Sequence, residues 1–128
     1  MQYTIKEVAE KVELTPHTLR YYENEGLLPY ILRDTNGNRV FSDTNVEWLR
    51  FVKCLRDTSM PISEMRHFVN LSMQGDDTVP ERMEILYQHR ENLEKKLKEM
   101  SIYLNNINNK IEHYESCNID VSKGKYKD

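Results

Sequence analysis

A short stretch near the start of the chain, TPHTLRYYENEG, concentrates side chains that can donate hydrogen bonds to an anion or to a base. It begins with a threonine followed by proline, a pair that predicts a helix start, because Thr caps free N–H groups and Pro tolerates the first helical position. His17, Thr18, Arg20 and Tyr21 follow within one and a half turns. Phosphate accepts hydrogen bonds from guanidinium and phenol groups alike, so this chemistry suits a nucleic acid. Tyr22 has a second interpretation, packing into the core against the preceding helix.

Composition and charge set the limits on this interpretation. The chain has 128 residues, of which 38% are hydrophobic and 30% charged, as expected for a soluble protein with a modest core. The net charge is −3, and residues 1–70 hold nine Lys and Arg against ten Asp and Glu. Nucleic-acid binding therefore depends on where individual cations lie, since the bulk charge does not favour it.

No segment indicates a membrane protein or a secreted one. The chain lacks a run of roughly 18 apolar residues and has no apolar signal-peptide core at its start, so we expect a cytoplasmic protein without a membrane partner. The two cysteines, Cys54 and Cys117, are far apart and are expected to be free thiols.

The elements that must position these residues can be predicted from caps and spacing. Thr4 and Glu7 form a capping box, and the apolar spacing behind them predicts a helix over residues 5–11. The second helix begins after Thr15 and is closed by Gly26. Two short helices joined by a tight turn predict a helix-turn-helix over about residues 4–23.

The next segment changes period and predicts a small β-hairpin, or wing, over about residues 28–42. Its turn is the Asn36-Gly37 pair, in which both residues tolerate positive φ. Ser42 or Asp43 then caps a third helix through about Asp57, and Ser63 begins a fourth helix.

From Thr78, another capping-box residue, the sequence predicts one helix of roughly 50 Å with a narrow apolar seam in 3-4 spacing. Only Arg90 interrupts this seam. The residues expected to dimerise are Leu86, Leu93, Leu97, Met100, Leu104, Ile107 and Ile111. So long a helix favours pairing with a second copy, with folding back onto its own domain as the alternative. We therefore expect a unit over 1–74 that contains the helix-turn-helix and the wing, a dimerisation coiled coil over 78–116 and a flexible tail over 117–128.

Three stretches together resemble the MerR family of bacterial transcription regulators: YTIKEVAEKVELTPHTLRYYENEGLL, RDTNGNRVFS and WLRFVKCLRDTSMPISEMRHFV. The resemblance covers residues 1 to about 115. It implies a mainly α-helical fold, in which a winged helix-turn-helix domain sits on a long antiparallel coiled-coil dimerisation helix. It also implies a homodimer that binds double-stranded promoter DNA and bends and untwists it, acting on RNA polymerase indirectly.

The resemblance assigns roles to individual residues. His17 and Thr18 lie near the N-terminus of the recognition helix, where side chains reach base edges in the major groove. Arg20 and Tyr21 suit phosphate contacts, while Arg33 and Arg39 on the wing are implied to hold the flanking backbone, and Arg66 on the fourth helix to do the same.

The resemblance also points to a sensor. The stretch CLRDTSMP resembles the thiol-based branch of the family, which responds to aldehydes and other electrophiles, so Cys54 is the candidate sensor thiol. Thiolate is the reactive form of cysteine and nearby cations favour it; Arg50 lies one turn before Cys54, and Lys53 and Arg56 are close in sequence. The alternative is that Cys54 is a small hydrophobic residue at the edge of the core.

Other functions stay open beside this one. His113 and Cys117 lie four residues apart, but one imidazole and one thiolate make a weak metal site, so no metal ligand and no cofactor are expected. A metal-responsive or signal-independent regulator of the same type, or a coiled-coil interaction module that does not bind DNA, are the alternatives. The four histidines show no nucleophile–base pairing, and the chain is not expected to be an enzyme.

Overall fold

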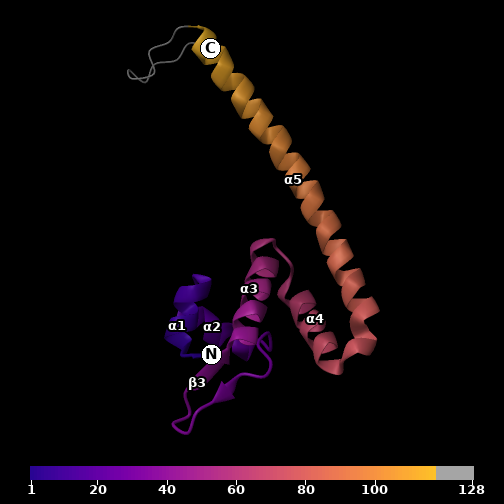
Figure 1. Cartoon of the computed structure of the whole chain (residues 1–128). Coiled ribbons are helices and arrows are strands. Elements are labelled where there is room, and N and C mark those ends of the chain that lie inside the picture. Colours follow the sequence, from indigo (N-terminus) through magenta and orange to yellow (C-terminus); the bar gives the residue numbers. More distant parts are fainter. Residues whose placement is uncertain (118–128) are drawn as a thin grey trace. The chain divides into compact units, whose positions relative to one another are not determined.

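The computed structural model describes residues 1–117 and is mostly helical (Figure 1). It divides into two compact units, one of residues 1–87 and one that begins at Gln88. Within the described residues, no helix is both long and apolar enough to cross a membrane. The flexible tail expected over residues 117–128 lies, from residue 118 onward, outside the described part of the chain.

The helix-turn-helix consists of α1 (Ile5–Val12) and α2 (Pro16–Asn24). The predicted capping box is present, because the Thr4 hydroxyl accepts from the Glu7 N–H at 3.2 Å and the Glu7 carboxylate accepts from the Thr4 N–H at 3.0 Å. The turn contains no glycine. Glu13 adopts the left-handed conformation there (φ 57°), and its N–H bonds back to the carbonyl groups at the end of α1.

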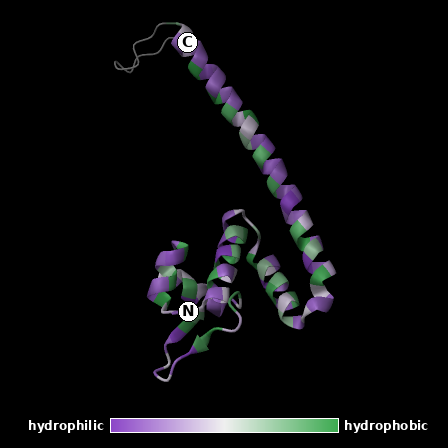
Figure 2. Ribbon diagram, in the orientation of Figure 1, coloured by the Kyte–Doolittle hydropathy of each residue, from purple (hydrophilic) through white to green (hydrophobic). Residues whose placement is uncertain are grey.

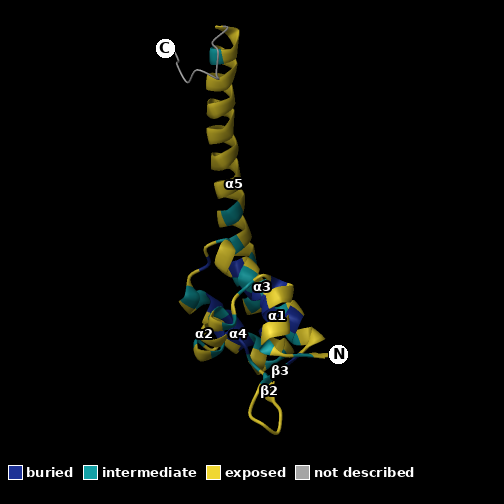
Figure 3. Cartoon of the chain, turned by 90° about the vertical axis from the view of Figure 1, so that its left-hand side faces the viewer, coloured by how far each residue is buried: buried dark blue, intermediate teal, exposed yellow. Residues whose placement is uncertain are grey.

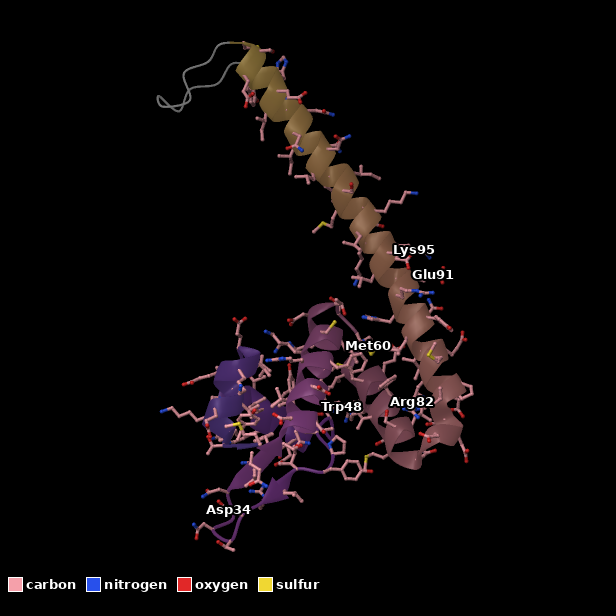
Figure 4. All side chains as sticks on the ribbon, in the orientation of Figure 1. Asp34, Trp48, Met60, Arg82, Glu91 and Lys95 are labelled. Carbon is pink, nitrogen blue, oxygen red and sulfur yellow. The ribbon has the colours of Figure 1, made fainter. Side chains whose placement is uncertain are left out.

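The wing consists of β2 (Leu32–Arg33) and β3 (Arg39–Ser42), paired antiparallel. In its turn Gly37 takes a positive φ (80°), whereas Asn36 does not. The Asp34 side chain stabilises the turn by accepting from the N–H groups of Asn36 and Asn38, both at 2.9 Å. Asp34 is labelled at the wing in Figure 4.

The sequence did not predict the first strand, β1 (Gln2–Tyr3), which pairs antiparallel with β3 so that Tyr3 lies opposite Phe41. The sheet order is β1-β3-β2, with β3 in the centre. Two residues are too few to show an alternating pattern, so the strand is visible only once its partner is in place.

Two further helices complete this unit: α3 (Asp43–Asp57) and α4 (Ile62–Gln74). Ser42 caps α3 through a capping box with Asn45. The fourth helix begins one residue before the predicted Ser63, with Pro61 at the cap position. The buried residues that form the core are Val8, Ala9, Val12, Leu19, Tyr22, Leu27, Leu28, Phe41, Val46, Leu49, Val52, Leu55, Met60, Met65 and Val69. This core fixes α2 and the wing, and Figure 3 shows its buried positions in dark blue.

A single 3-10 turn, η1 (Asp76–Thr78), precedes the long helix α5 (Val79–Ser116). Thr78 does not act as the predicted helix cap. Its buried hydroxyl donates to the carbonyl oxygens of Leu71 and Gly75, at 2.6 and 2.8 Å, and accepts from Nε of Arg82 at 3.0 Å. The start of α5 is thereby tied to the end of α4.

Within Val79–Ser116, α5 has no buried residue, although Ile85 and Leu86 in its first turns pack against the core. Hydrophobic positions recur at intervals along the helix among hydrophilic ones (Figure 2). The helix thus carries apolar side chains that are not buried in any core.

Candidate nucleic-acid interface

Helix α2 is anchored by two buried side chains, and the predicted contact residues lie elsewhere on its surface. Leu19 and Tyr22 are 1% and 2% exposed, whereas His17, Arg20 and Tyr21 are exposed. The latter three follow i, i+3, i+4 spacing and therefore share one face of the helix. The structure brings this part of the predicted site together.

Thr18 is half-buried and takes part in the cap of its own helix. Its N–H donates to the Thr15 hydroxyl at 3.1 Å, and the two hydroxyl groups are hydrogen-bonded at 2.9 Å. A hydroxyl can both donate and accept, so the Thr18 oxygen retains capacity for a second partner. His17, the exposed neighbour, is the less constrained of the two candidate base-reading residues.

Tyr22 belongs to the core, as the alternative interpretation of the sequence had it. Burial raises the pKa of its phenol and so keeps it neutral. The Arg56 guanidinium lies over the ring at 5.9 Å, while the hydroxyl has no hydrogen-bond partner among residues 1–117. Tyr22 thus packs α2 onto the core, while the neighbouring Tyr21 is exposed to solvent.

The wing arginines are held by an acidic residue that the sequence analysis did not identify. The Glu23 carboxylate, at the end of α2, accepts from Arg39 Nε at 2.9 Å and from Arg33 Nη2 at 3.4 Å. Arg33 also donates from Nη1 to the carbonyl oxygen of Gly37 at 2.9 Å. No spacing rule relates residue 23 to residues 33 and 39, because the contact depends on how the wing folds back.

A groove of about 480 Å³ separates the start of α1 from the wing. Lys6, Arg20 and Arg39 contribute cations to its lining, and Glu7 and Asp34 contribute carboxylates. Both carboxylates are also used locally, since Glu7 belongs to the capping box and Asp34 holds the wing turn. The lining of this groove thus carries three cationic side chains against two carboxylates.

Arg66, on α4, forms an ion pair with Glu25 beyond the end of α2, with Arg66 Nη1 3.5 Å from Glu25 Oε2. Its side chain is nearly half exposed. It is therefore linked to the recognition helix but does not line the groove beside the wing.

Cys54 is exposed on α3, so it does not belong to the buried core that the alternative interpretation placed it beside. Two of the cations expected to activate it have other partners. Lys53 donates to the carbonyl oxygen of Val12 at 3.1 Å, and Arg56 pairs with Asp57 at 2.9 Å. Arg50, one turn earlier, is exposed. The thiol is accessible to a small reagent, but fewer cationic groups are available to favour its thiolate than the sequence suggested.

His113, in the last turn of α5, and Cys117, directly after the helix, are both exposed. Within the described residues, no group of three or more His, Cys, Asp or Glu side chains is arranged to hold a metal ion. The geometry of residues 1–117 thus gives the weak two-residue site no further ligand.

The predicted dimerisation residues form an exposed stripe on α5. Leu86 and Leu93 are half-buried, and Leu97, Met100, Leu104, Ile107 and Ile111 are between 47% and 66% exposed. Ion pairs in i,i+4 spacing link Arg90, the charged position of the seam, to Glu94, and Lys95 to Glu91. Glu91 and Lys95 are labelled in Figure 4. Apolar side chains of this size and number are not normally left in water.

Comparison with known proteins adds independent findings. The model of the MerR helix-turn-helix family of regulatory proteins matches residues 3–71, and that of the MerR DNA-binding region matches residues 46–107. An uncharacterised HTH-type transcriptional regulator of Haemophilus influenzae is 36% identical, over 91% of this chain and 87% of the relative. The HTH-type transcriptional regulator AdhR of Bacillus subtilis is 37% identical, over 70% of this chain and 64% of its own length.

Among solved structures, the crystal structure of HiNmlR, described as a MerR family regulator lacking the sensor domain, bound to promoter DNA, matches with a TM-score of 0.85. The two sequences are 35% identical, and the match covers 92% of this chain and 94% of that chain. The likeness therefore extends through the winged unit into the long helix.

Proposed function

The chain belongs to the MerR family of DNA-binding transcription regulators, and we propose that it acts as a homodimer that remodels the promoter spacer to which it binds. The observation that carries this proposal is the exposed apolar stripe on α5. An antiparallel partner helix would cover the stripe and place two winged units at opposite ends of one coiled coil.

Each winged unit would contact one half of a pseudo-palindromic site. His17 and Thr18 would read base edges in the major groove, and Arg20 and Tyr21 would bind the phosphates beside it. The wing arginines, Arg33 and Arg39, would hold the flanking backbone, with Arg66 as a further phosphate contact. The shared exposed face of α2 and the cationic side of the groove support these roles.

Two recognition helices joined through one dimer would limit the distance between half-sites, and DNA that does not match this distance would have to bend or untwist. Sequence-dependent deformability would then contribute to specificity at positions that the protein does not touch. RNA polymerase would respond to the altered promoter geometry and so be an indirect partner.

Cys54 is the proposed sensor thiol for a reactive aldehyde. Its thiolate would attack the carbonyl carbon, forming a C–S bond while the carbonyl oxygen takes up a proton, which gives a hemithioacetal without any redox step. The exposure of the thiol supports access of the reagent. The neighbouring Lys53 contact with Val12 offers a route from α3 to the helix-turn-helix.

In vitro transcription from the gene's own upstream DNA tests this function. Templates whose spacer is shortened by one or two base pairs would reveal spacer remodelling, because the wild-type protein should activate only the natural spacing. The sensor is tested on the natural template with an aldehyde, comparing wild type with Cys54→Ser and, as a matched control, Cys117→Ser. We expect loss of the aldehyde response only in Cys54→Ser. An equal response in all three proteins would refute the thiol sensor, and activation independent of spacing would refute remodelling.

A further inference from the structure

Glu23 joins the recognition helix to both strands of the wing through one carboxylate. Arg39 comes from β3 and Arg33 from the end of β2, and both guanidinium groups contact the same oxygen, Glu23 Oε1. The Glu23 and Arg39 side chains are only 22% and 20% exposed, against 50% for Arg33. The shorter and better sheltered contact is therefore the one to Arg39, at 2.9 Å.

The geometry of this contact leaves Arg39 able to bind a second anion. Glu23 takes up the Nε donor. Of the four N–H groups on Nη1 and Nη2, one points to the same side as Nε–H, and the other three point away from it in the same plane. A carboxylate behind a guanidinium fixes its plane, and a phosphate can then bind in front of it. Arg39 also lines the groove beside α1, together with Arg20.

A carboxylate so close to this surface should repel the phosphate backbone. If charge alone mattered, removing Glu23 would strengthen binding to every DNA. If the carboxylate instead orients the wing arginines, removing Glu23 weakens binding to the natural site, because misoriented arginines no longer contact the phosphates. The sign of the change in affinity therefore separates the two roles.

We propose that Glu23 is a positioning residue for DNA recognition, which aims Arg39 at the backbone and holds the wing at a fixed distance from the recognition helix. This inference rests on the proposed phosphate contacts of the wing. It assigns to one acidic residue of α2 the link between the sequence-reading helix and the backbone-holding wing.

The first measurement compares Glu23→Gln, which keeps the shape and removes the charge, with Glu10→Gln, which makes the same change on the exposed surface of α1. Each is titrated with the natural upstream duplex and with a duplex of random sequence. We expect Glu23→Gln to weaken binding to the natural duplex about fivefold while binding to random DNA stays equal or strengthens. Glu10→Gln should leave the ratio of the two affinities unchanged. Thermal unfolding of both variants checks that they are folded.

The second measurement is a double-mutant cycle of Glu23→Gln with Arg39→Gln, together with Arg39→Lys, which keeps the charge but cannot reach both groups. Under the proposal, Glu23→Gln adds much less loss once Arg39 is replaced, because only the longer contact with Arg33 is left to break. Arg39→Lys should lose about as much as Glu23→Gln. Additive losses, or tighter binding of Glu23→Gln to the natural duplex, would overturn the role of Glu23. If Arg39→Gln itself binds the natural duplex normally, the proposed wing contact fails, and the inference fails with it.

Discussion

The winged unit and the long helix differ in how far each satisfies its own side chains. Residues 1–87 enclose a continuous core in which Val8, Phe41 and Leu49 have no exposed surface. From Gln88 to Cys117 the helix has no buried residue, although Leu97 and Met100 are among its exposed apolar side chains. The first unit has the buried core of a folded domain, whereas the second exposes apolar side chains of the kind found on one side of a helix–helix interface.

The two units are therefore stabilised in different ways. The winged unit is built from caps, turns and a packed core, and each of these acts within the unit. The long helix is stabilised within itself by local side-chain pairs such as the i,i+4 ion pairs Arg90–Glu94 and Lys95–Glu91, each worth about 0.2–0.5 kcal/mol. Mutations in the core of the winged unit should therefore reduce its stability, whereas mutations in the seam of the long helix should reduce assembly.

The largest effect is expected in the core of the winged unit. Phe41 is fully buried on the central strand, so Phe41→Ala should reduce the free energy of unfolding by about 3–5 kcal/mol through lost burial and the cavity left behind. Leu32→Ala, on the neighbouring strand, removes a side chain that is 67% exposed and should cost less than about 0.5 kcal/mol. Urea denaturation measures both. Equal losses would show that the core does not carry the stability of this unit.

The next effect is expected on α5 and concerns assembly. Leu104 and Ile102 are 58% and 53% exposed, but only Leu104 lies in the seam. A charge in the seam must be buried on pairing, so Leu104→Glu should give a monomer that binds the natural duplex at least about 100-fold more weakly. Ile102→Glu should stay dimeric, as measured by analytical ultracentrifugation. Two dimeric variants would argue against the seam as the interface.

A smaller effect separates the two kinds of DNA contact on α2. Arg20→Gln removes a phosphate contact and should weaken binding to all duplexes alike, lowering the slope of log affinity against log salt by about one. His17→Ala should instead reduce discrimination between bases at one position by about 1–3 kcal/mol. Titrations at several salt concentrations on natural and base-substituted duplexes distinguish them. A sequence-dependent effect of Arg20→Gln would reverse the assignment.

The smallest effect is expected at the exposed contact between β1 and α3. The Tyr3 hydroxyl donates to the Asp43 carboxylate at 2.7 Å, which lowers the pKa of Asp43 below its ordinary value of 3.8. Since the folded pKa is the lower one, this stabilisation is present above about pH 4 and is lost as the pH falls through the folded value. Tyr3→Phe should therefore lower the melting temperature slightly at pH 7, and this difference should shrink steadily as the pH is lowered below about 4. A difference that does not change with pH would assign the effect to packing.

Local signals in the sequence were sufficient for most of the fold. Thr4, Thr15 and Ser42 cap the first three helices, and Gly37 closes the wing turn, because each of these features depends on residues only a few positions apart. The exposed face of α2 and the seam of α5 follow in the same way from helical periodicity.

Features that depend on distant residues could not be predicted. β1 is too short to carry a pattern, and Glu23 meets Arg33 and Arg39 only after the wing has folded. Thr78 begins a capping-box motif, yet its hydroxyl is used by Leu71 and Arg82 instead. The exposure of Cys54 likewise depends on which face of α3 the core occupies, and helical spacing at its edge does not decide this.

A second copy of the chain should complete the long helix, so that two winged units occupy one DNA site. The mass of the complex with the natural upstream duplex, determined by sedimentation equilibrium across a range of protein concentrations, tests this. We expect two chains per duplex, with no stable complex of one chain. A complex of one chain per duplex with undiminished affinity would contradict dimeric binding.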